Sequence, residues 1–159
     1  MPFGNSVDAY VAATPAVDRE VTCAVNLAFI LSSSAADGGA TAVPDGQLLF
    51  VTSGWEHSCA IDEDNEPTCF GSNKEGELDL TKDAKFAQFA LGTNLTCGLL
   101  TGGTIFCYGA DAHEQATGKP EGSDWVGLDC GSTHCCAFDS ASNVSCWGDD
   151  SKGQATPEL

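Results

Sequence analysis

The sequence predicts an all-β protein made of four propeller-type blade repeats. A unit of 38 to 39 residues recurs, as the steps between Tyr10, Leu48, Phe86 and Trp125 show. Short stretches of apolar, β-forming residues alternate with glycine and polar turns, and we find no sustained helical apolar face. A period in the range of about 20–50 residues indicates one supersecondary unit used several times. Three or four short strands per unit are typical of propeller blades.

The repeat units are expected at residues 10–47, 48–85, 86–124 and 125–159, after an N-terminal extension at residues 1–9. The second unit shows the expected order of elements. The apolar stretch at Leu48 predicts a first strand, and a turn follows at Gly54. A second strand carries Cys59, and after a polar turn a third strand carries Cys69. The first unit is expected to contain a hairpin, and the four units either close a small ring or form an open partial propeller.

Six of the nine cysteines form three pairs with a common spacing of ten residues. The pairs are Cys59 with Cys69, Cys97 with Cys107, and Cys136 with Cys146. Facing residues on adjacent antiparallel strands have Cα atoms about 4.5–5.5 Å apart, which suits a disulfide. The first unit carries Val21 and Leu31 at the same positions, as expected if the two positions touch. Disulfides are favoured over reduced buried thiols, and over a metal site because structural zinc usually takes more closely spaced cysteines.

The remaining cysteines are Cys23, Cys130 and Cys135. Cys130 and Cys135 flank the turn at Gly131 and are candidates for a fourth disulfide. Cys23 stands where the other units have Ile61 or its equivalents, so we expect a small buried apolar side chain. Three or four disulfides predict an oxidising compartment. Secretion, a periplasm and an organelle lumen, including the thylakoid lumen, all fit.

The chain is strongly acidic, with 23 acidic and 6 basic residues and a net charge of −17. A nucleic-acid interface needs basic side chains to neutralise phosphates, so no nucleic-acid partner is expected. An anionic membrane surface is disfavoured for the same reason. The acidity serves either solubility or a cationic partner. No segment has the about 20 apolar residues of a membrane span, and any targeting sequence is expected to lie outside the chain or to have been removed.

Candidate functional residues are few. His57 and His134 occupy equivalent repeat positions, where each is either a structural blade histidine or a partner contact. Trp55 lies beside a turn and is the candidate for an exposed partner-binding anchor. Asn94 and Asn143 begin glycosylation sequons, which matter in a eukaryotic secretory route. The sequence shows none of the catalytic or phosphate-binding motifs that we sought. We therefore expect no enzyme, no cofactor and no metal site.

The repeat motif resembles the regulator-of-chromosome-condensation family. The residues that carry the resemblance are Gly54-x-x-His57-Ser58-Cys59-Ala60-Ile61, Cys69-Phe70-Gly71-Ser72-Asn73 and Gly76-Glu77-Leu78, with a second set at Gly131 to Ala137, Cys146-Trp147-Gly148 and Gly153-Gln154. The resemblance spans residues 10–159 and implies propeller blades. Members of the family include a nucleotide-exchange factor, protein inhibitors of enzymes and scaffolds. This chain has four short units where the family typically has seven, and its acidity does not suit chromatin, so nucleotide exchange and histone contact are not carried over.

A repeat scaffold without a catalytic constellation predicts a function through binding surfaces. We expect a non-enzymatic interaction scaffold that is a peripheral structural subunit of a larger assembly. The alternative is a soluble carbohydrate-binding or enzyme-inhibiting propeller protein. An open arc exposes blade edges, which need cover against aggregation, so we expect a protein partner to mask them, either a second copy or another subunit. Docking on a membrane complex is compatible with this expectation, whereas a direct span is not.

Overall fold

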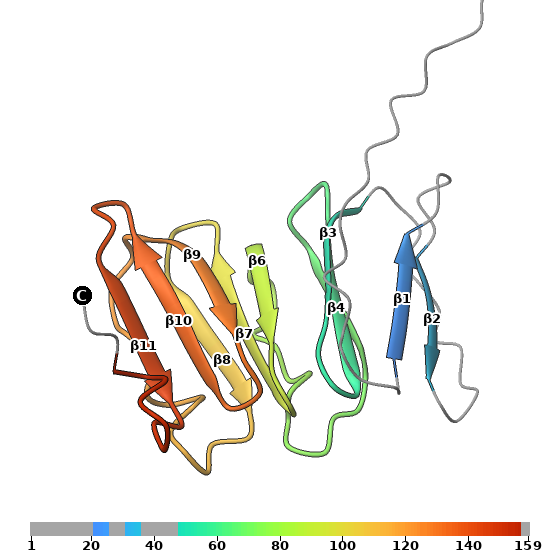
Figure 1. Ribbon diagram of the computed structural model, residues 1–159. Coiled ribbons are helices and arrows are strands. Elements are labelled where there is room, and N and C mark those ends of the chain that lie inside the picture. Colours follow the sequence, from blue (N-terminus) through green and yellow to red (C-terminus); the bar gives the residue numbers. More distant parts are fainter. Residues whose placement is uncertain (1–20, 26–30, 36–47, 157–159) are drawn as a thin grey trace, which may run out of the picture.

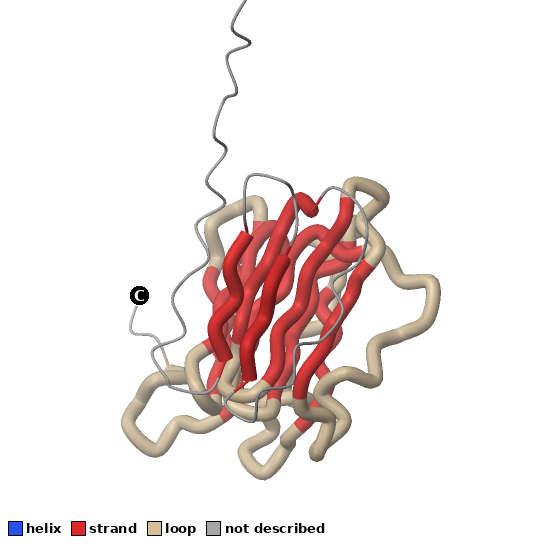
Figure 2. The backbone as a smooth tube through the Cα atoms, turned by 90° about the vertical axis from the view of Figure 1, so that its right-hand side faces the viewer, coloured by secondary structure: helices blue, strands red, loops and turns tan. Residues whose placement is uncertain are grey.

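The computed structural model of the 159-residue chain describes residues 21–25, 31–35 and 48–156, the first two ranges at the level of the backbone. The described residues form strands and loops without a helix, so none of them provides a helix that could cross a membrane (Figure 2). The strands are β1 (Val21–Val25), β2 (Leu31–Ala35), β3 (Leu48–Ser53), β4 (His57–Asp62), β5 (Pro67–Gly71), β6 (Phe86–Leu91), β7 (Leu95–Leu100), β8 (Ile105–Gly109), β9 (Trp125–Cys130), β10 (His134–Asp139) and β11 (Val144–Gly148). The expected all-β class is confirmed.

The strands form one antiparallel sheet for each repeat unit. The second, third and fourth units are three-stranded sheets with the orders β3-β4-β5, β6-β7-β8 and β9-β10-β11, and the described part of the first unit is the hairpin β1-β2. The sheets stack side by side, with β1 and β2 at one end and β11 at the other (Figure 1). They are the blades of an open partial propeller, and the described residues do not close a ring. The extension at residues 1–9 lies outside the described residues, so the expected domain boundaries stay a prediction.

The register of each complete blade places its two repeat cysteines opposite each other. Cys59 faces Cys69 across β4 and β5, and the two are joined in a disulfide. The other disulfides are Cys97–Cys107, Cys136–Cys146 and Cys130–Cys135. All four expected pairs are therefore present. Four disulfides within a chain of this size indicate an oxidising environment.

The first unit departs from the register that its sequence position predicts. Val21 faces Ala35 and Leu31 faces Val25, so the expected contact between Val21 and Leu31 is wrong. Cys23 faces Ser33. The structure describes this strand at the level of the backbone, so the expected burial of the Cys23 side chain stays a prediction. In the other blades a disulfide fixes which residues face each other. Without that link, hairpin register depends on the turn and on side-chain packing alone.

Successive blades bury their apolar side chains against one another. Side chains along a strand alternate between two sheet faces, so each blade has a forward face toward the following unit and a backward face toward the preceding unit. Ile61, on the forward face of the second blade, packs with Phe86 and Phe89 on the backward face of the third. Leu99 and Leu128 belong to the corresponding cluster between the third and fourth blades. Full burial of one such side chain contributes about 1.5–3 kcal/mol to folding.

Candidate functional site

The forward face of the fourth blade differs from those of the second and third because no described blade covers it. This face carries Asp129, His134, Cys136, Phe138, Val144 and Cys146, as the strand register and the repeat positions establish. Each of these residues is partly or well exposed. The face lies at the end of the arc beyond β10 and β11 in Figure 1. It is the candidate functional site.

The exposed fractions of the side chains at one repeat position show how the fourth blade differs from the second and third. Ile61 in the second blade is 1% exposed and Leu99 in the third is 4% exposed, whereas Phe138 in the fourth is 49% exposed. The same holds one strand further on, where Ile105 is fully buried and Val144 is exposed. The fourth blade thus presents apolar side chains at positions that are covered in the preceding blades. An exposed apolar patch of this kind is a candidate interaction site.

Exposure of Val126, elsewhere on the fourth blade, does not indicate a missing neighbour. Val126 in β9 is about as exposed as Phe138. Its equivalents Leu49 and Ala87 are also exposed in their own blades. Exposure at this position is therefore a property of every blade, and Val126 does not belong to the open face.

Polar groups surround the apolar centre of the open face. Asp129 is exposed at the position that Ala90 occupies in the third blade, and its Oδ1 accepts a hydrogen bond of 2.9 Å from the backbone N–H of Cys130. Asp139 directly follows Phe138, and hydrogen bonds from the side chain and backbone of Asn143 hold its pKa below the ordinary value. The lowered pKa keeps Asp139 ionised at neutral pH, so the rim of the face carries negative charge.

The loop after the fourth blade also lacks the neighbouring blade that covers the equivalent loops of the second and third units. Glu77 and Gln115 occupy one repeat position and are fully or almost fully buried. A Cβ atom built on Gly109 or Gly148 of the following blade would lie 3.2 Å from the Cβ of Glu77 or Gln115 respectively, so each side chain packs beneath the next blade. Gln154 is the equivalent residue after the fourth blade and is partly exposed. Loop and sheet therefore both present a surface that the preceding units bury.

The two histidines of the expected partner site lie in different environments. His57 is fully buried, and its Nε2 lies 2.8 Å from Thr96 Oγ1 in the third blade. Burial lowers the pKa of His57, so the ring is neutral at physiological pH. Because the third blade covers His57, its position fits the structural blade histidine and not the alternative of a partner contact. His134 is partly exposed on the open face, where a partner can reach it.

The tryptophans also separate into exposed and buried positions. Trp55 is 43% exposed, as an anchor requires. Trp147 is buried, and its indole N–H donates to the backbone oxygen of Gln115 at 2.9 Å. Trp125 packs at the edge of the same apolar cluster. Trp55 lies in the second blade and Phe138 in the fourth, so the structure does not unite Trp55 and His134 in one patch.

An open hollow of about 510 Å³ lies where the third and fourth blades meet. Leu99, Trp125 and the turn at Gly102 and Gly103 contribute to its lining. Among its lining residues, Asp124 is the single ionisable side chain. The hydroxyl side chains of Thr101, Ser123 and Ser140 also line the hollow, but its lining holds no histidine, lysine or second carboxylate that could pair with Asp124 as acid and base.

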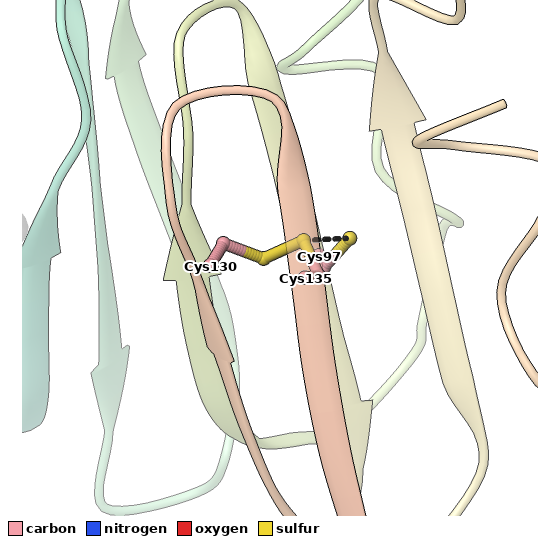
Figure 3. Close-up of side chains that lie close together, drawn as sticks. All are labelled: Cys97, Cys130 and Cys135. Atoms are coloured by element: carbon pink, nitrogen blue, oxygen red, sulfur yellow. Dashed lines mark hydrogen bonds between the residues drawn. A yellow bond between two sulfur atoms is a disulfide. The ribbon is translucent and has the colours of Figure 1, made fainter. Parts of the chain in front are cut away.

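Three sulfur atoms cluster at the junction of the third and fourth blades. The Sγ atoms of Cys97, Cys130 and Cys135 lie within 4.8 Å of one another (Figure 3). Thiolates at such separations can surround a zinc ion. Here each sulfur is in a disulfide and offers no thiolate. The sequence does not reveal this cluster, because the repeat period shows which residues are equivalent but not which ones meet between blades.

The described fold and its open face define a disulfide-linked propeller arc. The sequence pattern of the regulator of chromosome condensation (RCC1) repeat matches residues 50–77. These residues include most of the second blade, and the structure repeats that blade twice more. The second blade thus resembles an RCC1 repeat, and the third and fourth blades share its three-stranded architecture. No curated protein sequence shows significant similarity to the chain.

Solved propeller structures resemble the arc. The ectodomain of the Arabidopsis thaliana receptor kinase ACR4 is 21% identical with a TM-score of 0.62, over 82% of this chain and 45% of that one. The ectodomain of the Physcomitrella patens receptor kinase CR4 is 24% identical with a TM-score of 0.67, over 81% and 38%. Prp20p from Saccharomyces cerevisiae is 12% identical with a TM-score of 0.66, over 82% and 43%. This chain thus spans less than half the length of these structures, and the likeness concerns the fold.

Proposed function

We propose that the chain is a non-enzymatic interaction scaffold that binds a protein partner through the forward face of its fourth blade. The observation that carries the proposal is the exposure of Phe138 at a position where Ile61 and Leu99 are buried. The face has the side chains of an interface between blades and lacks a described neighbour. Covering it removes apolar surface from water, which contributes about 25 cal/mol for each Å².

The partner is expected to match both the apolar centre and the negative rim of this face. Phe138 and Val144 supply the centre, and Asp129 and Asp139 supply carboxylates beside it. A complementary surface has an apolar sheet face bordered by lysine or arginine. A second copy of this chain fits less well because it brings another net charge of −17. Another subunit of a larger assembly is therefore the proposed occupant.

The proposed role is that of a peripheral structural subunit in a secreted or lumenal setting. The four disulfides support an oxidising location. The single ionisable residue in the lining of the hollow supports a role without catalysis. Binding of protein partners has a parallel in Prp20p, whose structure is described with its binding to Gsp1p and histones.

A site-specific photocrosslinker tests the proposed surface. Benzoylphenylalanine at position 138 is compared with the same residue at position 126, because Phe138 and Val126 have similar exposure but only Phe138 lies on the open face. Each protein is irradiated in an extract of its native source, and the crosslinked peptides are identified by mass spectrometry. We expect a discrete product at position 138 that carries lysine or arginine near the crosslink, and at least tenfold less of it at position 126.

Three results would count against the proposal. Equal labelling at positions 138 and 126 would show that the open face has no preferred partner. A crosslink from position 138 to the chain itself would identify a second copy as the occupant. Turnover of chromogenic ester, phosphate or glycoside substrates by the purified protein would contradict the non-enzymatic part.

A further inference from the structure

Two disulfides touch each other across the junction between the third and fourth blades. The sulfur of Cys97, which is bonded to Cys107, lies 3.7 Å from the sulfur of Cys135, which is bonded to Cys130. Cys97 and Cys135 are fully buried, whereas Cys107 and Cys130 are partly exposed. Each disulfide thus has one partly exposed cysteine and one buried cysteine whose sulfur touches the other disulfide. Figure 3 shows the sulfur of Cys135 beside that of Cys97.

The Cys130–Cys135 disulfide has no counterpart in the other complete blades. The equivalent facing pair in the second blade is Ser53 and Ser58, whose hydroxyls are hydrogen-bonded at 3.1 Å. In the third blade it is Leu91 and Thr96. A blade of this type therefore forms without a disulfide at this position. The second and fourth blades differ in chemistry at the same backbone geometry.

We propose that these four cysteines form a thiol–disulfide exchange site whose co-substrate is a dithiol reductant. The reductant thiolate attacks the sulfur of the partly exposed Cys130, which forms a mixed disulfide, and Cys135 is released as a thiolate. The Cys135 thiolate then attacks Cys97. The Cys97–Cys135 bond forms, the Cys97–Cys107 bond breaks, and Cys107 leaves as a thiolate that takes a proton from water.

The second thiol of the reductant resolves the mixed disulfide and leaves Cys130 as a thiol. Two electrons pass from one dithiol to the protein, so that two disulfides become one and the reductant is oxidised to its own disulfide. Entry at Cys107 leads to the same product, because it releases Cys97 as the thiolate that attacks Cys135. The product links the third blade to the fourth, whereas both original disulfides lie within single blades.

The sequence allows the exchanged disulfide to be read directly. Cleavage after glutamate separates residues 78–114, which contain Cys97 and Cys107, from residues 122–158. The second fragment contains Cys130 and Cys135 together with the disulfide-bonded pair Cys136 and Cys146. Each original disulfide lies within its own fragment, whereas the exchanged disulfide joins the two fragments. The folded protein is treated with one equivalent of dithiothreitol, quenched with acid, alkylated with N-ethylmaleimide, digested and mapped by mass spectrometry. A Cys23→Ser background removes the remaining thiol.

We expect the joined fragments to carry alkylated Cys107 and Cys130, and to be at least tenfold more abundant than any other interfragment link. Alkylation of Cys130 and Cys135 with Cys97–Cys107 intact, and no joined fragments, would overturn the proposal. A Cys107→Ser/Cys130→Ser variant tests the geometry without a reductant, because it leaves Cys97 and Cys135 as thiols that should oxidise to the interblade disulfide. The matched control is Cys69→Ser/Cys130→Ser. It leaves thiols at Cys59 in the second blade and at Cys135 in the fourth, which are separated by the third blade, so no such link should form. If either variant fails to fold, the reduction experiment on the intact pairs still decides.

Discussion

The imidazole of His57 in the second blade lies 2.8 Å from the hydroxyl of Thr96 in the third blade, in the protein interior. This hydrogen bond joins two sheets whose other contacts are mainly apolar. His57 therefore connects one blade to the next and does not face solvent. Its burial has a consequence for the pH dependence of stability.

Stability should fall as the pH decreases from 7 toward 5, in part because of His57. Burial lowers the pKa of His57 in the folded state, and the opposing charge of Glu77 compensates only in part. As the pH falls below about 6.5, the ordinary pKa of histidine, His57 is protonated in the unfolded chain while it is still neutral in the folded protein. Acid therefore favours unfolding. Above that pH His57 is neutral in both states and does not make the free energy of unfolding depend on pH. Urea unfolding at pH 7.5 and pH 5.5 should show a smaller pH effect in a His57→Gln variant than in the original protein, and equal slopes would contradict this assignment.

A methyl group at Gly92 should strain the contact between the third and fourth blades. A Cβ atom there would lie 2.7 Å from the backbone oxygen of Gly131 and 2.8 Å from that of Ser132. Backbone cannot yield as a flexible side chain can, so we expect Gly92→Ala to cost about 1–3 kcal/mol. Gly102→Ala is the matched control, since a Cβ atom at Gly102 would meet nothing within 4 Å. Chemical denaturation of both variants measures the difference, and equal stabilities would argue against close blade contact at Gly92.

The repeat period was enough to predict the blades, the strands of the complete blades and the three disulfides with a spacing of ten residues. Equivalent spacing in three units placed Cys59 opposite Cys69, and the structure has that pair in register. The first unit shows the limit of this reasoning. Val21 and Leu31 hold the equivalent sequence positions but do not face each other. Sequence equivalence does not fix register where no disulfide enforces it.

Contacts between blades were not predictable from the period. The alternation of side chains along β4 does not reveal which face meets the following blade. The sequence therefore left His57 as either a structural blade histidine or a partner contact, and only the structure shows that the third blade buries it. The contact between Cys97 and Cys135 was missed for the same reason. It depends on how closely two blades stack, and no local pattern records that distance.

Truncation at one repeat position should have unequal effects in different blades. Ile61→Ala removes a side chain that is packed against Phe86 and Phe89, and we expect a cost of about 2–5 kcal/mol. Phe138→Ala removes a half-exposed ring at the equivalent position, so the isolated chain should lose about 1 kcal/mol or less. Urea unfolding of the isolated protein gives both values. A loss at Phe138 as large as that at Ile61 would mean that the open face is covered within the isolated protein.

Replacement of both cysteines of the fourth-blade disulfide should leave the fold intact. The second blade has Ser53 and Ser58 at these positions, and their hydroxyls are bonded at 3.1 Å. A Cys130→Ser/Cys135→Ser variant can adopt the same arrangement, so it loses mainly the constraint that a short disulfide loop places on the unfolded chain. The chain-entropy model gives about 2 kcal/mol for such a loop. The single variant Cys135→Ser should be less stable than the double variant, because the new hydroxyl at the buried position 135 then faces the thiol of Cys130, which is a weaker hydrogen-bond partner than a second hydroxyl. Non-reducing urea unfolding compares the three proteins, and loss of the cooperative transition in the double variant would show that this disulfide is required for folding.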